Sequence, residues 1–338
     1  MKPIFFSLFA ACMIFSAAAR AETVADAMKA AQDKEGQGDW AGAIEIYNAI
    51  IQQYPKEFPI AYALRASDRS LVDDNKGAVA DYTKALDLDK DPKNPDLDHG
   101  HIYGERAQAK RFSRDPKGAV ADYHLAVKAN PGDSFTIADL AETEMEELGD
   151  CAAANTDYSQ AIALAKEPEV LYFENRAIVR LCLGDVANSY SDYQSSVALE
   201  LKETSPSFQS LYLDAWAVGV RLGRKDDADK ALTDQLAATT PETGDLHIDR
   251  DIASVYLGKA DISLIAKAAA TYAHGNPDDS WMEYGLYYTA IKEMVDGDNK
   301  AALASFQQAV ASKSHLNETE MQARAWIKIL GGGGAKKK

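Results

Sequence analysis

The chain has 338 residues, 46% of them hydrophobic and 26% charged, which is the composition of a globular protein. It carries 52 acidic against 36 basic residues, giving a formal net charge of −16. Because nucleic-acid phosphates and anionic lipid headgroups repel a body this acidic, the composition argues against nucleic acid or a membrane surface as its partner.

The first 21 residues have the features of an export signal. Lys2 supplies a positive charge, and the apolar run Ile4–Phe15 follows it. Ala19 and Ala21 are small residues at the positions that a signal peptidase requires. The run is too short to span a membrane, so we predict cleavage after Ala21, a periplasmic location and no membrane span. Lipidation at Cys12 is the alternative.

Along the rest of the chain, a small residue recurs four positions before an aromatic residue. Five copies are strong, with steps of 35, 41, 35 and 35 residues, and three weaker copies follow at steps of 39, 35 and 39. A fixed period in this range indicates stacked supersecondary units. The strong copies begin at Ala43, Ala78, Ala119, Ala154 and Ser189, and the weak ones at Ala228, Ser263 and Ala302.

Each unit is predicted to contain two helices. In the second helix, apolar and small residues recur three and four apart, as in Ala78, Tyr82 and Ala85, which places them on one helical face. A Gly-Asp turn often precedes this helix. The glycine ends the first helix in a left-handed cap, and the aspartate caps the second helix. These glycines are Gly38, Gly149, Gly184 and Gly297.

The segment FENRAIVRLCLGDVANSYSDYQSSVAL, Phe173–Leu199, shows the complete pattern of aromatic residue, small residue, Leu-Gly-Asp turn, small residue, aromatic residue and small residue. This pattern resembles the tetratricopeptide repeat. The resemblance implies an all-α fold, a right-handed superhelical solenoid of about eight helix-turn-helix repeats. A C-terminal capping helix is predicted after the last repeat, because Asn317 and Glu320 read as a capping box before apolar residues.

The later repeats depart from the pattern, since Trp216 stands at a normally small position and Lys267 at an aromatic one. They are therefore expected to pack differently. The predicted segments are a signal peptide (residues 1–21), a solenoid (22–330) made of regular repeats (22–200), degenerate repeats (201–313) and a capping helix (316–330), and a flexible Gly/Lys tail (331–338).

The sequence contains none of the common enzyme motifs: no G-x-S-x-G, phosphate loop, HExxH or paired C-x-x-C. We therefore predict no catalytic residues and no cofactor. One acidic segment, DLDKDPKNPDLDHGH, coincides with the longest step between repeats. Its candidate metal ligands are Asp96, Asp98, His99 and His101. A proline stands where a calcium loop requires glycine, so we predict a flexible solvated connector and no metal, with a metal site as the weaker alternative.

Two cysteines, Cys151 and Cys182, remain after removal of the signal, an even number in an exported protein. Cys151 begins the second helix of one unit, and Cys182 lies near the end of the first helix of the next unit. These two helix ends are neighbours in stacked hairpins. The spacing therefore predicts a Cys151–Cys182 disulfide, with two small buried thiols as the alternative.

In the proteins that this chain resembles, the first helices line a concave groove that takes peptides or helices. By spacing, this face is polar in the early units, with Gln32, Ser67 and Gln108, and apolar in the later ones. Exposed apolar surface of that length marks an interface, so we predict that a partner binds there. Burial of this apolar row among the later units is the alternative. The row comprises Leu171, Ile178, Leu181, Leu213, Val220, Ile248, Ile252, Val255, Tyr284, Tyr287, Ile291 and Met294.

Three functions are compatible with these patterns. The first is an exported, non-catalytic scaffold in the bacterial cell envelope that binds a protein or peptide in the concave groove. The second is an envelope enzyme, for instance one acting on cell-wall glycan, whose active site was added to an α-solenoid. The third is a structural protein that self-associates into a homo-oligomer. The repeat, the signal and the lack of catalytic motifs favour the first.

Overall fold

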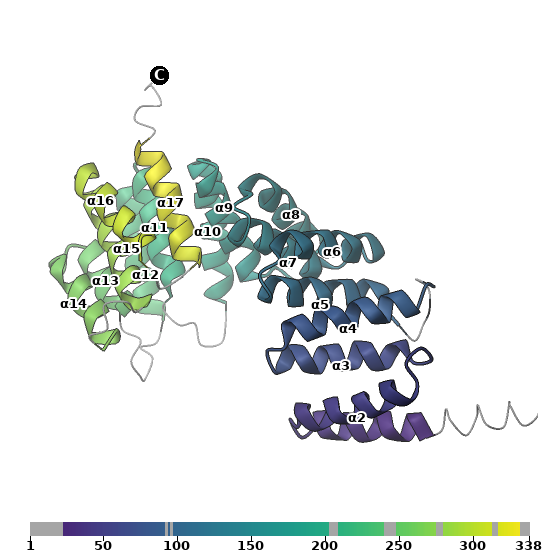
Figure 1. Cartoon of the computed structure of the whole chain (residues 1–338). Helices are drawn as coiled ribbons and strands as arrows, with labels where there is room; N and C mark the ends of the chain where they lie inside the picture. The colour runs from purple at the N-terminus through teal and green to yellow at the C-terminus, as the bar shows by residue number, and fades with distance from the viewer. Residues whose placement is uncertain are drawn as a thin grey trace, which may run out of the picture. The chain divides into compact units, whose positions relative to one another are not determined.

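The computed structural model describes residues 23–91, 94, 97–202, 209–239, 248–274, 280–312 and 317–331. Within these ranges all regular secondary structure is helical (Figure 1). None of the helices in them is long and apolar enough to cross a membrane. The predicted signal peptide, Asp96 and the tail beyond Gly331 lie outside the described residues.

The helices form pairs that match the predicted repeats. A helix over residues 23–35 pairs with α2, seven further pairs follow, and α17 comes last. The prediction of an all-α array of eight repeats with a C-terminal helix is confirmed. The helices are α2 (Trp40–Gln53), α3 (Pro59–Leu71), α4 (Asn75–Leu88), α5 (His99–Phe112), α6 (Pro116–Ala129), α7 (Ser134–Glu146), α8 (Cys151–Leu164), α9 (Val170–Cys182), α10 (Val186–Glu200), α11 (Ser210–Arg221), α12 (Lys225–Ala238), α13 (Ile248–Tyr256), α14 (Ser263–Tyr272), α15 (Ser280–Val295), α16 (Asn299–Val310) and α17 (Asn317–Gly331).

The small and aromatic residues of the repeated motif form the core. All five strong small-residue positions are fully buried, and the aromatic residues four positions later are at most 2% exposed. A small residue lets the two helices of a pair approach closely, and the aromatic ring then fills the space towards the next pair. The aromatic residues are Tyr47, Tyr82, Tyr123, Tyr158 and Tyr193.

The turn inside each repeat contains a residue with positive φ, as the Gly-Asp pattern predicts. Gly149 has φ 65°, and the following Asp150 accepts the backbone N–H of Ala153 at 3.1 Å, which caps α8. In the second and third repeats, Asp73 (φ 63°) and Arg114 (φ 66°) take the place of the glycine. The stacking therefore imposes the left-handed turn even where the residue does not favour it.

The chain divides into two compact units, residues 1–132 (unit 1) and 133–338 (unit 2). Unit 1 contains the first three repeats, and unit 2 begins with α7. This boundary falls inside the regular repeats expected for residues 22–200. The physical reason lies in α17, which packs against α7 and α9 and so ties the fourth and fifth repeats to the last ones.

Candidate interaction surfaces

The apolar row predicted to bind a partner lies mostly in the interior of unit 2. Val220 and Tyr284 are partly exposed, and Leu171 is 64% exposed, but the other nine residues are buried. The expectation of an open apolar groove is therefore wrong, because unit 2 packs this row inside itself. The nine buried residues are Ile178, Leu181, Leu213, Ile248, Ile252, Val255, Tyr287, Ile291 and Met294.

The C-terminal helix α17 closes this side of unit 2. It packs against α9, α15 and α16 (Figure 1). Its Trp326 is fully buried. The side-chain amide of Gln322 donates to Asp214 on α11 at 3.1 Å and lies 3.3 Å from the hydroxyl of Tyr193 on α10. A cap at the end of an open array would contact only its neighbouring repeat. Here one helix contacts six others, α7 included, so it fills part of the side on which a partner was expected.

Asp214 is the centre of a buried polar network. The hydroxyls of Tyr287 and Tyr288 donate to its Oδ1 at 3.2 and 3.3 Å, and Gln322 donates to its Oδ2. Burial raises the pKa of Asp214 to about 7, although these donors act in the opposite direction. Since Asp214 is only 4% exposed, the network positions α11, α15 and α17 and is closed to a substrate.

The candidate metal loop does not assemble a metal site in the part of the chain that the structure describes. Asp98 caps α5 by accepting the backbone N–H of His101 at 3.2 Å, and the His101 side chain is exposed. His99 is buried, with its Nε2 3.3 Å from a carboxylate oxygen of Asp89. No group of three metal-binding side chains occurs among the described residues. The predicted solvated connector is wrong at Asp89 and His99, which are both buried.

Cys151 and Cys182 form a disulfide, with their Cα atoms 6.4 Å apart. Cys151 is the first residue of α8, and Cys182 is the last residue of α9. The bond therefore joins the fourth repeat to the fifth within unit 2, as the spacing predicted. Bonds of this kind persist in oxidising compartments and are rare in the cytosol.

An ion-pair cluster that the sequence analysis missed recurs in unit 1. In the second repeat, Arg65 on α3 donates to both carboxylate oxygens of Asp81 on α4, at 2.6 and 2.7 Å, and Arg69 donates to the same carboxylate at 2.9 Å. Arg65 also reaches Asn48 of the preceding repeat at 2.6 Å. Asp81 is only 4% exposed. This aspartate is therefore a buried partner of the two arginines and not a solvated residue. We call the arrangement the basic–aspartate clasp.

The third and fifth repeats contain the same clasp. In each, two basic residues of the first helix pair with one buried aspartate of the second helix, in the bidentate geometry that makes such hydrogen bonds strong. A sequence signal was available, because the basic residues stand 16 and 12 positions before the aspartate in each case. The sets are Arg106 and Lys110 with Asp122, and Arg176 and Arg180 with Asp192.

The fourth repeat lacks the clasp. Ala141 and Met145 stand 16 and 12 positions before Asp157, and both are fully buried. Glu144, 5% exposed, faces Asp157 instead. Burial, helped by the charge of Asp157, raises the pKa of Glu144 to about 8. This carboxyl pair therefore retains a proton at neutral pH.

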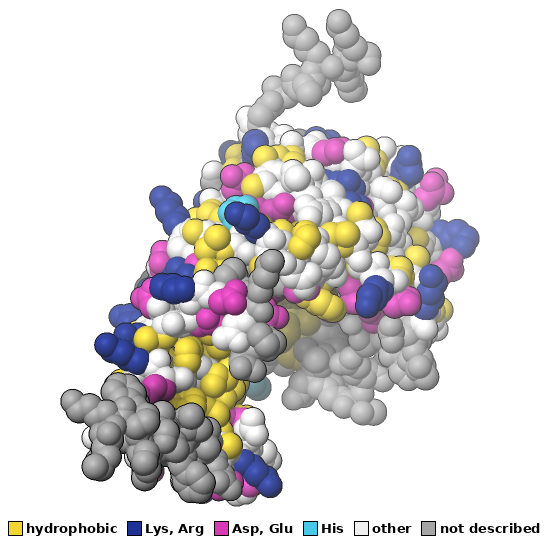
Figure 2. Space-filling view, turned by 90° about the vertical axis from the view of Figure 1, so that its right-hand side faces the viewer, with side chains coloured by type: hydrophobic (Ala, Val, Ile, Leu, Met, Phe, Trp, Pro, Cys, Tyr) yellow, Lys and Arg dark blue, Asp and Glu magenta, His cyan; other side chains and the backbone are white. Residues whose placement is uncertain are grey.

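The first helices of unit 1 keep side chains exposed on the side predicted to meet a partner. Gln32, His101 and Gln108 are exposed. At the ends of α3 and α5, Leu71 is 56% and Phe112 is 62% exposed. Figure 2 shows one face of the molecule, on which hydrophobic side chains lie among acidic and basic ones. Unit 1 thus offers a mixed polar and apolar surface, whereas unit 2 covers most of the corresponding row.

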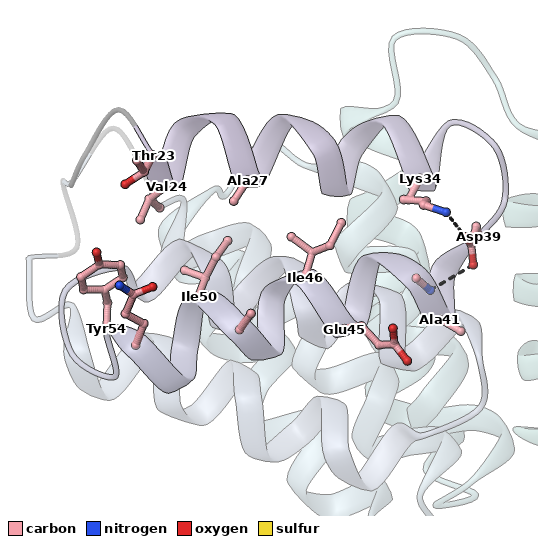
Figure 3. Close-up of a pocket in the computed structure, with 13 residues that line it drawn as sticks. Thr23, Val24, Ala27, Lys34, Asp39, Ala41, Glu45, Ile46, Ile50 and Tyr54 are labelled. Atoms are coloured by element: carbon pink, nitrogen blue, oxygen red, sulfur yellow. Dashed lines mark hydrogen bonds and ion pairs between the residues drawn. The ribbon is translucent and has the colours of Figure 1, made fainter. Parts of the chain in front are cut away.

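A groove of about 680 Å³ runs between the helix over residues 23–35 and α2. Val24 and Ala27 line it from the first helix, and Ile46 and Ile50 line it from α2 (Figure 3). At one end the ammonium group of Lys34 pairs with the carboxylate of Asp39 at 2.7 Å (Figure 3). The volume lies within the range of pockets that hold small ligands or single side chains.

No protein-family model matches the chain, and no curated protein matches its sequence. The structure is similar to that of a tetratricopeptide repeat protein from Parabacteroides merdae, with 14% identity and a TM-score of 0.53, covering 90% of this chain and 99% of that one. It is also similar to the C-terminal part of a TPR repeat-containing protein from Cytophaga hutchinsonii, with 14% identity and a TM-score of 0.50, covering 87% and 98%. The chain therefore has the tetratricopeptide-repeat fold.

Proposed function

We propose that the protein is an exported, non-catalytic scaffold of the bacterial cell envelope that binds a protein or peptide partner. The observation that carries this proposal is the contrast between the two units on the first-helix side. Unit 2 packs most of its apolar first-helix row inside itself, whereas unit 1 keeps polar first-helix side chains exposed together with Leu71 and Phe112, which are 56% and 62% exposed. Large apolar side chains exposed beside polar ones are typical of a binding surface.

Two features support export. The segment before residue 22 has the charge, apolar run and small residues of a cleavable signal. The disulfide between Cys151 and Cys182 suits an oxidising compartment such as the periplasm. Sequencing the N-terminus of the protein isolated from cells should therefore give Glu22 as the first residue. A protein that starts at Met1 in the cytosolic fraction would contradict the export part of the proposal.

Site-specific photocrosslinking tests the binding part. A photoreactive residue at position 71 or 112 should capture the same partner in intact cells, whereas one at Leu125 should not. Leu125 is a fair control because it is also exposed, at 41%, but lies on a second helix of unit 1. Once the partner has been purified, Phe112→Asp should weaken its affinity by at least about tenfold, the effect of losing a buried anchor. Equal capture from position 125 would refute this site.

The partner-binding role of the apolar row in unit 2 remains a prediction, but its nine buried residues would first have to be uncovered. Charged substitutions at Ile252 or Tyr287 would not test it cleanly. Both side chains are buried, at 0% and 1% exposure, so a charge there would disrupt folding before it affected binding.

A further inference from the structure

The groove of the first repeat lies where another repeat carries an aromatic ring and an arginine. In the second repeat, the guanidinium of Arg65 lies 5.5 Å from the ring centroid of Tyr62 and pairs with Asp81. The first repeat is 35 residues earlier in the same register, and there Ala27 and Ala30 replace the tyrosine and the arginine. Ala27 and Ile46, which stand at the positions of Tyr62 and Asp81, both line the groove, so the first repeat leaves open a space next to the position where the second repeat carries a ring.

The third and fifth repeats fill the same space in the same way. Their guanidiniums lie 5.5 and 5.7 Å from the ring centroids of the aromatic residues three positions earlier. Each stacked arginine also pairs with the buried aspartate of its clasp. The groove in the first repeat therefore lies at the position that holds an aromatic ring in the second, third and fifth repeats. The pairs are Arg106 over Tyr103 and Arg176 over Phe173.

The position that holds the clasp aspartate in other repeats shows which side chain the groove would accept. In the first repeat it is occupied by Ile46, which lines the groove and is partly buried. Without a carboxylate at that position, a partner's guanidinium would lack its charged acceptor, whereas an aromatic ring could pack on Ile46, Ala27 and Val24. Isoleucine in place of aspartate also makes this outer face of the first repeat less soluble, because the outer face of a repeat array is normally polar.

Small residues alone do not leave this space open. The fourth repeat also has alanines at the two positions, Ala138 and Ala141, but both are buried and a fully buried Met145 stands in place of the second basic residue. In the first repeat that place is held by Lys34, which turns to Asp39 at the end of the groove (Figure 3). The open groove of the first repeat therefore depends on the particular residues of that repeat and not on the two alanines alone.

We propose that this groove docks an aromatic side chain of a peptide segment, which would take the place that the Tyr62 ring has in the second repeat. The rim supplies polar partners for the peptide backbone, from Glu45 and Gln53 on α2 and from the Lys34–Asp39 pair. This surface is distinct from the Leu71 and Phe112 side, so the proposal goes beyond the function proposed above and stands or falls independently of it.

The test uses the full mature chain and two blocked tripeptides, Gly-Trp-Gly and Gly-Leu-Gly. Methyl NMR of Val24, Ile46 and Ile50 should show saturable shifts with the tryptophan peptide, with a dissociation constant on the order of 1 mM for one anchoring side chain. The leucine peptide should bind at least about tenfold more weakly, a difference of about 1.4 kcal/mol. Equal affinity for the two peptides, or no saturable shift, would overturn the proposal.

A variant whose groove is filled by its own side chains provides the comparison with the unchanged protein. Ala27→Tyr, Ala30→Arg and Ile46→Asp together rebuild the set of the second repeat and should abolish tryptophan-peptide binding. Ala121→Tyr, at an exposed position on α6, is the control and should leave binding unchanged. Should the triple variant fold poorly, Ala49→Arg on the exposed wall of the groove should block entry on its own. Undiminished binding by folded Ala49→Arg protein would also overturn the proposal.

Discussion

Units 1 and 2 are built from the same repeat but differ in what holds them together. In unit 1 the charged contacts are local: Arg65 and Arg106 each reach an aspartate 16 residues later. Unit 2 keeps one such local clasp, between Arg176 and Asp192. Its buried polar network, however, joins distant segments: Tyr287 and Asp214 are 73 residues apart, and Gln322 and Tyr193 are 129 apart. A terminal helix that packs back against earlier repeats can thus join distant segments into one compact unit.

The net charge also differs between units 1 and 2. Residues 1–132 carry 19 acidic and 17 basic side chains, whereas residues 133–338 carry 33 acidic and 19 basic. The acidity that seemed to belong to the whole chain is therefore concentrated in unit 2. An anionic partner would be repelled mainly by unit 2, and the nearly neutral unit 1 is open to partners of either charge.

The largest expected effect comes from removing the side chain that closes unit 2. Trp326 is fully buried, so Trp326→Ala should lower the free energy of unfolding of unit 2 by about 3–5 kcal/mol through lost burial and an unfilled cavity. Hydrogen exchange followed by mass spectrometry should show faster exchange in α9 to α17 and unchanged exchange in α3 to α6.

A surface aromatic in the same unit is the control for this prediction. Phe135 is 66% exposed, and Phe135→Ala should change exchange little. If Trp326→Ala accelerated exchange in unit 1 as much as in unit 2, the two units would unfold together, and the contrast between local and distant contacts would not govern stability.

The disulfide should give the next largest effect, again in unit 2 alone. It closes a loop of 31 residues, and such a crosslink contributes about 3–4 kcal/mol by restricting the unfolded chain. Replacing Cys151 and Cys182 by alanine should lower the denaturant midpoint of unit 2 accordingly. Mass spectrometry of protein isolated without reductant should find the two residues linked, and two free thiols would contradict the bond.

Much of the architecture was predictable because the residues that define each repeat lie close together in the sequence. Ala154 and Tyr158 stand four residues apart on one helix, and Gly184 and Asp185 mark a turn because the glycine has positive φ and the aspartate caps the next helix. Helix pairs, their number and the cysteine pairing all follow from such short-range spacing. The later repeats also pack differently, as the residues that depart from the repeat pattern suggested: Trp216 stacks on Tyr256 with ring centroids 4.3 Å apart.

The binding surface was not predictable in the same way, because it depends on where α17 lies. The contact between Gln322 and Asp214 spans 108 residues and has no periodic counterpart in the sequence. Amphipathic spacing shows that Ile252 and Ile291 face inward or towards a groove, but it cannot say which helix covers them. The clasp is a different case, since Arg106 and Asp122 repeat at a constant spacing that the sequence shows, and the pairing could have been predicted from it.

A smaller effect is expected from breaking one clasp in unit 1. Asp122→Ala would leave Arg106 and Lys110, which are 13% and 19% exposed, without their shared carboxylate. Removing one partner of a buried pair costs about 3–5 kcal/mol, and the partial exposure of the basic side chains reduces this to about 2–3 kcal/mol. Denaturation monitored in unit 1 measures the loss. Asp115→Ala, which removes only the cap of α6, is the control at about 1 kcal/mol.

The smallest effect distinguishes the fourth repeat, where the clasp is replaced by a carboxyl pair. Burial raises the pKa of Glu144 to about 8 from an ordinary value of 4.5. Between these pH values the folded protein holds a proton that the unfolded chain has released, so stability is lost as pH rises through this window. Asp214, whose pKa is raised to about 7, adds a loss of the same sign. Glu144→Gln cannot ionise, and it should raise the stability of unit 2 at pH 8 by about 1 kcal/mol, or a few degrees in melting temperature.

The pH profile separates this cause from a general gain in stability. The difference between Glu144→Gln and the unchanged protein should shrink as the pH falls from 8 towards 5, because both then carry an uncharged side chain at this position. Glu147→Gln removes an exposed carboxylate nearby and should leave the profile unaltered. A constant difference across the whole range would mean that glutamine packs better for reasons unrelated to the proton. In that case the carboxyl pair would not be what sets the fourth repeat apart from the clasped repeats on either side of it.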